Sequence, residues 1–187
     1  MTSPATERLI KNLADKKGGY ECFTSLLWVN ILNQTFPIND GDSWLYAPEF
    51  ARDLGRCDLV IMQSKDDNAW PAQFQAIGLP FIAVEFKCAG VKSGDAEWKK
   101  AYAQMTSTME YFLSERWYKS QTVYGIVAAG TKCALYQWDG SDENDGFRLM
   151  HEERPMLDLA KADEQKIILD LFGTMKITSP AGSHLIW

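Results

Sequence analysis

The stretch Phe81-Ile82-Ala83-Val84-Glu85-Phe86-Lys87 constrains the fold of this chain most. Seven mostly apolar residues with aromatic and β-branched members, opened by Pro80 and closed by Ala89-Gly90, predict a buried β-strand. The strand nevertheless ends with a carboxylate and an ammonium two positions apart. Side chains at i and i+2 leave a strand on the same face, roughly 6.6 Å apart along it, so Glu85 and Lys87 share a face. Because charged groups are rarely buried unless they are paired or bound to a metal, this pair indicates a site at the end of a core strand.

A second strand-like run, residues 56–62, supplies a partner for these charges. It places Asp58 near the start of a strand whose later residues are apolar. If the two strands pair, Asp58 and Glu85 converge at one edge of the sheet with Lys87 beside them. Two carboxylates suit a hard cation such as Mg²⁺, which keeps several waters and asks for one or two carboxylates plus substrate phosphate. A lysine beside that ion could orient or deprotonate an attacking water, or stabilise charge on the scissile phosphate.

Asp58 followed by Glu85-Phe86-Lys87 resembles the D…E-x-K signature of the PD-(D/E)XK nuclease superfamily, which has the restriction-endonuclease-like fold. The resemblance implies that Asp58 and Glu85 bind Mg²⁺ (or Mn²⁺) and that Lys87 is the catalytic lysine. At the first motif position Cys57 stands in place of proline, and that position varies within the superfamily.

Two further residues follow from the same resemblance. The family often carries a glutamate on the helix before the sheet, which Glu21 matches as a third metal ligand. It also often has a glutamine or lysine on the helix after the E-x-K strand, which Gln104 matches. A plainer reading stays open for each: the helix dipole favours an acid in a first turn, as at Glu21, and Gln104 can be an ordinary surface glutamine.

Periodicity predicts the remaining elements. Helices are expected over about 5–17, 20–34, 96–118 and 162–174, with Gln104 in the third. Inward-facing positions of the second helix are expected to be Phe23, Leu26, Leu27, Asn30 and Ile31. Strands are expected over 44–47, 56–62, 81–87, 123–129, 132–138 and 147–150, with hairpin turns at 48–55 and at Gly130-Thr131. The polar stretch 63–80 reads as a loop, or as a loop with a helical turn over 72–77.

This order predicts an α/β fold, restriction-endonuclease-like, with a central mixed β-sheet flanked by helices and an αβββαβ core. The whole of 1–187 reads as a single domain. The motif-bearing core covers about 20–138, and an acidic loop and a C-terminal helix occupy 139–187.

The charge of the chain limits the kinds of partner that it is expected to bind. The net charge of −6 counts against a strongly basic nucleic-acid-binding surface. Residues 139–170, however, hold ten acids and four bases, so the motif-bearing part is nearly neutral. The resemblance therefore still implies nucleic acid, DNA or RNA, as the partner, contacted through its phosphate backbone, with Lys92, Lys99 and Lys100 as candidates. Many relatives dimerise, which leaves a homodimer open.

Cysteine usage and the lack of a signal peptide or a long apolar run predict an intracellular protein, in cytoplasm or nucleus, with no membrane partner. Cys57, Cys88 and Cys133 lie in apolar strand contexts, which predicts buried, reduced thiols.

Three functions compete for this sequence. The first is a Mg²⁺- or Mn²⁺-dependent phosphodiesterase, endonuclease or exonuclease, that uses Asp58, Glu85, Lys87 and Gln104. The second is a non-catalytic binding module that retains the nuclease fold, with Glu85 and Lys87 as an internal salt bridge. The third, acid–base hydrolysis by the two carboxylates as in glycosidases, gives Lys87 no necessary part and ranks last.

Overall fold

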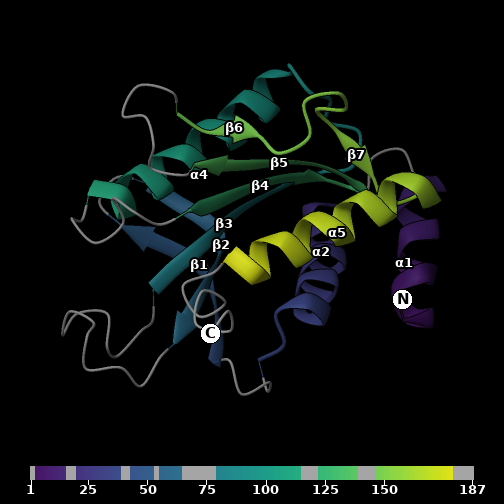
Figure 1. Cartoon of the computed structure of the whole chain (residues 1–187). Helices are drawn as coiled ribbons and strands as arrows, with labels where there is room; N and C mark the ends of the chain where they lie inside the picture. Colours follow the sequence, from purple (N-terminus) through teal and green to yellow (C-terminus); the bar gives the residue numbers. More distant parts are fainter. Residues whose placement is uncertain are drawn as a thin grey trace.

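The computed structural model describes residues 3–15, 20–38, 43–52, 55–64, 79–114, 122–138 and 146–178. In these ranges it is a mixed α/β structure with an open, seven-stranded sheet and four helices (Figure 1). The sheet and the flanking helices confirm the α/β fold class. None of the described helices has the length and apolar character needed to span a bilayer.

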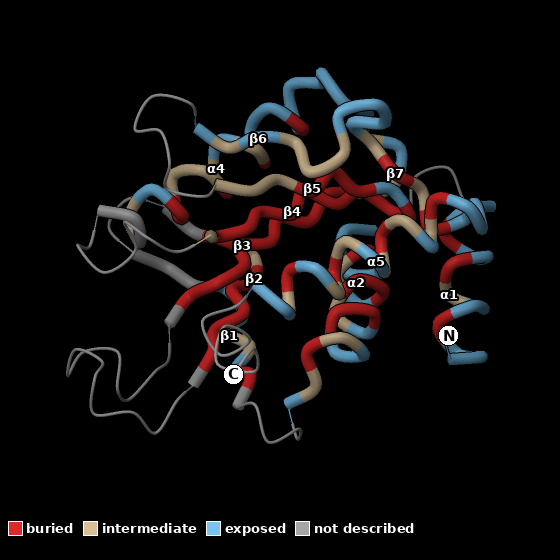
Figure 2. Tube along the Cα trace, in the orientation of Figure 1, coloured by how far each residue is buried: buried red, intermediate tan, exposed pale blue. Residues whose placement is uncertain are grey.

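The sheet has the strand order β1-β2-β3-β4-β5-β6, with β7 beside β5. β3 and β4 are parallel and every other described pair is antiparallel. The strands are β1 (Ser43–Arg52), β2 (Gly55–Ser64), β3 (Leu79–Lys87), β4 (Val123–Ala129), β5 (Lys132–Trp138), β6 (Arg148–Leu149) and β7 (Leu157–Asp158). β7 is a short strand that the sequence did not predict. The two central strands β3 and β4 are buried along nearly their whole length (Figure 2), as their uninterrupted apolar sequences require.

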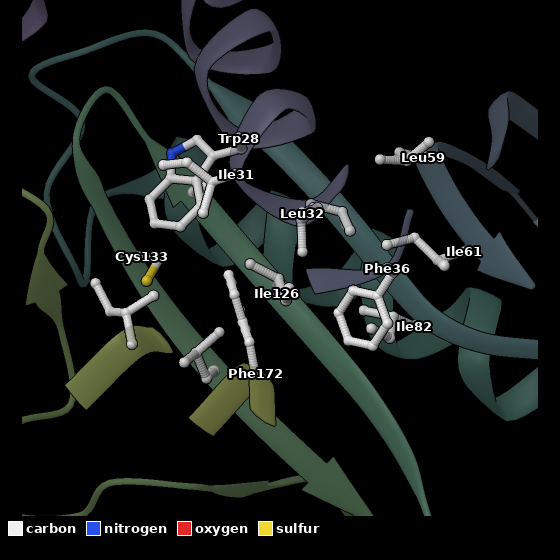
Figure 3. Close-up of a cluster of buried hydrophobic side chains, with 14 of the residues drawn as sticks. Trp28, Ile31, Leu32, Phe36, Leu59, Ile61, Ile82, Ile126, Cys133 and Phe172 are labelled. Atoms are coloured by element: carbon white, nitrogen blue, oxygen red, sulfur yellow. The ribbon is translucent and has the colours of Figure 1, made fainter. Parts of the chain in front are cut away.

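Helices cover both faces of the sheet. α4 (Ala96–Ser114) packs on one face, and α2 (Glu21–Thr35) and α5 (Ala162–Thr178) pack on the other (Figure 1). α1 (Pro4–Asp15) packs beside α2. A separate apolar cluster fills each interface. In the larger one, Trp28 and Ile31 of α2 and Phe172 of α5 converge on Ile126 and Cys133 of the sheet (Figure 3).

The predicted inward face of α2 was wrong in part. Leu27 and Ile31 are buried as expected, but Phe23, Leu26 and Asn30 are exposed. Apolar residues lie all around this helix, so periodicity alone does not fix its orientation.

Two hydrogen bonds to the β4–β5 turn orient α2. The indole of Trp28 donates to the carbonyl of Gly130 (2.9 Å), and the amide of Gly130 donates to the hydroxyl of Thr24 (3.0 Å). Gly130 has a positive φ of 61°, and a Cβ there would lie 2.8 Å from the Cβ of Ala89. The turn therefore requires glycine for both its conformation and its packing.

Other expectations differ in smaller ways. The hairpin β1–β2 is longer than expected and runs through Pro48, which an edge strand such as β1 tolerates. Cys57 and Cys133 are buried, but Cys88 is exposed because β3 ends at Lys87. The expected loop at 63–80 falls mostly on 65–78, outside the described residues, together with its alternative helical turn.

Close packing of α4 on β4 gives a first prediction. A Cβ on Gly125 would collide with the side chain of Met105, whereas Gly173 in α5 has open space around its Cα. Gly125→Ala should lower the free energy of unfolding by about 1–3 kcal/mol through overpacking. Gly173→Ala, the matched control, should leave it unchanged or raise it by up to ~1 kcal/mol because helices favour alanine over glycine. Urea denaturation measures both. A Gly125→Ala protein as stable as the wild type would show that the Met105 side chain moves aside without cost.

Candidate metal and catalytic centre

β2 and β3 separate at the end of the sheet that carries the charged residues. Their pairing stops at Leu59 and Val84, although β2 begins at Gly55 and β3 continues to Lys87. Beyond this point β3 remains paired with β4, up to Lys87 opposite Ala129, and β2 remains paired with β1. The sheet thus opens between the two strands. We call this opening, with Asp58, Glu85 and Lys87 at its mouth, the fork.

Side chains of β2 replace the missing backbone pairing at the fork. The amide of Phe86 donates to Oδ2 of Asp58 at 2.7 Å. The thiol of Cys57 donates to the carbonyls of Val84 (3.3 Å) and Leu59 (3.4 Å). Burial, and after it the nearby charge of Glu85, raises the pKa of Cys57 to about 12. A thiol that stays protonated is a poor nucleophile, so Cys57 acts here as a structural hydrogen-bond donor.

Lys87 connects the two carboxylates. Its Nζ donates to the carbonyl of Phe86 at 2.8 Å and to Oε2 of Glu85 at 3.5 Å, and it lies 3.9 Å from Oδ2 of Asp58. Both acidic side chains therefore approach the same nitrogen from two different strands. The lysine side chain is 11% exposed, that of Asp58 29% and that of Glu85 0%. The fork thus holds two acids and one base, and solvent reaches it mainly at Asp58.

Glu85 is the least satisfied group of the fork. Its Oε1 is buried and has no hydrogen-bond partner. Burial, and then the negative charge of Asp58, raises the pKa of Glu85 to about 8, against a smaller lowering effect of Lys87. Buried polar atoms are nearly always hydrogen-bonded, so a buried oxygen without a partner suggests that a ligand binds there. A divalent cation is one such partner, and two carboxylates form a donor set that fits Mg²⁺ or Mn²⁺.

The two other residues expected at the site lie on helices. Glu21 is exposed in the first turn of α2, and Gln104 is half-buried on α4, the helix that covers the Glu85 face of the sheet. Within the described ranges, no three His, Cys, Asp or Glu side chains form a group that could hold a metal ion. Asp58 and Glu85 therefore stand as a pair that Glu21 does not complete, and the role of Gln104 stays a prediction.

A pocket that sequence reasoning missed lies beyond the ends of β3 and β4. It has a volume of about 300 Å³, and its lining includes Thr131, Lys132 and Asp158. These residues follow the E-x-K strand by more than 40 positions and carry no motif. The parallel pairing of β3 with β4 brings Thr131 and Lys132 to this end of the sheet, and the pairing of β7 with β5 brings Asp158 there.

The raised pKa of Glu85 gives a second prediction. A carboxyl that binds its proton more tightly in the folded state is most favourable to stability below its unfolded pKa, near 4.5, and loses that contribution as the pH rises to about 8. Between pH 5 and pH 8 the wild type should therefore lose stability relative to Glu85→Gln, on the order of a few kcal/mol. Urea midpoints across this range measure the difference.

The control for this measurement is Glu97→Gln, which removes an exposed carboxylate from the first turn of α4. Its pH profile should parallel that of the wild type. If the Glu85→Gln profile also parallels the wild type, the carboxyl of Glu85 is not in a desolvated, negatively charged surrounding.

Comparisons of the chain with protein-family models, with curated proteins and with solved structures find no match. Any function assigned to the chain therefore rests on its own residues and their geometry.

Proposed function

We propose that this protein is a divalent-metal-dependent nuclease, with a restriction-endonuclease-like fold, that hydrolyses phosphodiester bonds of nucleic acid. The observation that carries the proposal is the fork itself: two carboxylates and an ammonium gathered at one strand end, with a buried carboxylate oxygen that lacks a partner. The element order supports the fold, because in the described ranges α2, β1, β2, β3, α4 and β4 come in the order of the αβββαβ core.

The side chains have separate roles in this proposal. Asp58 and Glu85 would hold one Mg²⁺ or Mn²⁺ ion, whose positive charge would stabilise the phosphate and acidify a bound water. Asp58 is fixed for this by the hydrogen bond from the Phe86 amide to its Oδ2. Glu85 offers the orphaned Oε1. Gln104, on the helix that covers the Glu85 face, belongs to the same proposal as a group that orients water or phosphate, whereas Glu21 lies outside the Asp58–Glu85 pair.

Lys87 is placed to act on the nucleophile or on the scissile phosphate. An ammonium has three N–H donors, and the carbonyl of Phe86 and the carboxylate of Glu85 take two of them. The third can donate to an attacking water or to a phosphate oxygen as negative charge develops there. Its attachment to the end of β3, a buried central strand, holds the amine rigidly relative to both acids.

A second candidate is a binding module that keeps the fold without catalysis. The ion pairs between Lys87 and the two acids favour it, since they already balance part of the buried charge. So does the net charge of −6, which does not attract nucleic acid.

Cleavage assays give the third prediction. Wild-type protein with Mn²⁺ or Mg²⁺ should cut plasmid, single-stranded DNA or structured RNA, and EDTA should stop the reaction. Asp58→Ala, Glu85→Gln and Lys87→Ala should each reduce the rate by 100-fold or more, because each removes a group that acts on the transition state. Circular dichroism should show that the variants remain folded. Lys166→Ala, a change of an exposed lysine on α5, serves as the control and should cut normally. Equal cleavage by all five proteins would dismiss the nuclease.

Calorimetric titration with Mn²⁺ gives the fourth prediction and separates the two candidates. The nuclease reading expects one Mn²⁺ per chain, with affinity that rises from pH 6 to pH 8 as the ion displaces the proton from Glu85. Asp58→Asn and Glu85→Gln should abolish the heat of binding, whereas Asp95→Asn, in the exposed loop before α4, should retain it. A saturated internal salt bridge, as in the binding module, should bind no Mn²⁺ at either pH.

A further inference from the structure

The pocket beside the fork lies where open α/β sheets commonly bind ligands, beyond the carboxyl ends of neighbouring parallel strands. β3 and β4 form that pair, and the pocket is bounded by the loop that follows β3, the turn that follows β4 and the C-terminal end of α1. Its volume of about 300 Å³ suits a ligand of modest size.

Residues close to Lys87 in the chain and in the sheet line the pocket. Lys87 pairs with Ala129, and Ala129 lines the pocket. Ala89, two residues after Lys87, lines it as well. The chain leaves the strand after Lys87 for a turn, so the Cα atoms of Lys87 and Ala89 lie at most about 7 Å apart. A substrate strand that presents one phosphate to the fork can therefore place its neighbouring nucleotide in the pocket.

The lining matches a nucleotide in chemistry. Leu13, Ala14 and Val91 offer apolar surface to a sugar and base, and the exposed side chains of Lys92 and Lys132 bring two positive charges to a phosphate.

One acid also lines the pocket. Asp158 accepts hydrogen bonds from the hydroxyl of Thr131 (2.6 Å) and the amide of Ala160 (3.0 Å), both through Oδ1. Those two donors offset part of its negative charge, and the charged groups of the lining sum to one net positive charge.

We propose that this pocket binds the nucleotide next to the scissile phosphate. Lys92 and Lys132 bind the phosphate group of that neighbouring nucleotide. The inference rests on the proposed nuclease function and specifies how the substrate strand crosses the end of the sheet. The pocket is a binding subsite, and its contribution does not depend on the metal.

Binding without metal provides the fifth prediction. Fluorescence anisotropy of a fluorescein-labelled 12-nucleotide single strand, and of the matching duplex, is measured in EDTA over a range of NaCl concentrations. The double change Lys92→Ala with Lys132→Ala should weaken binding tenfold or more at low salt. The association constant should also depend less steeply on salt: the magnitude of the slope of its logarithm against log[NaCl] should fall by about one, because one phosphate contact is lost. Ala14→Trp, which fills the pocket without changing charge, should weaken binding at least fivefold with the slope unchanged.

The matched control removes two lysines from α5, Lys166→Ala with Lys176→Ala, and changes the net charge of the protein equally. It should bind within twofold of the wild type. The subsite is overturned if the Lys92/Lys132 variant behaves like this control, or if the wild type binds neither strand nor duplex. Failure of the nuclease proposal looks different: binding in EDTA would still depend on the pocket, but Mn²⁺ would produce no cleavage.

Discussion

The hydrogen bond between the Phe86 amide and the Asp58 carboxylate is the interaction on which the site depends. It replaces a backbone contact at the point where β2 leaves β3, so the sheet opens without an unsatisfied amide on its central strand. The same bond brings an acid from β2 to within 3.9 Å of the amine of Lys87 on β3. Without the opening, Asp58 would be an ordinary strand residue and Glu85 would face a closed sheet. The charged groups of the fork thus come together because β2 and β3 stop pairing there and side chains of β2 replace the missing backbone hydrogen bonds.

Burial makes the ionised form of Glu85 unfavourable, and this raises its pKa. The Glu85 carboxyl is fully buried, beside a second acid, and its one nearby base also serves a backbone carbonyl. Burial raises its pKa, so near neutral pH the group keeps its proton or needs more positive charge. In the proposed metal site, a divalent cation would supply that charge and would be bound by Oε1. If the site binds a metal as proposed, proton and metal would compete for the Glu85 carboxylate, and folding stability, pH and metal affinity would be linked through this side chain.

Much of the fold could be predicted from the sequence because its strands are strongly patterned. The runs 123–129 and 132–138 match β4 and β5 at both ends, and the glycine at 130 marks the turn between them. The face of α2 could not be predicted, because apolar residues surround that helix and the bonds of Trp28 and Thr24 to Gly130, which help to fix the buried side, are tertiary contacts. β7 escaped prediction because two residues carry no period, and its pairing with β5 is a tertiary contact. At the site, alternation along β3 correctly placed Glu85 and Lys87 together. The hydrogen bonds of Cys57 depend on where β2 separates from β3, and the pocket depends on which strand lies parallel to β3. Local residue spacing predicts neither.

The most direct test of the central claim is anomalous X-ray diffraction at the manganese edge from crystals soaked in MnCl₂ near pH 8. The fork as described here predicts one strong anomalous peak within bonding distance, about 2.0–2.3 Å, of an Asp58 oxygen and of Oε1 of Glu85, with Nζ of Lys87 beside it. A map with no peak there, in crystals whose other manganese positions are occupied, would contradict the claim that these two carboxylates form a metal site.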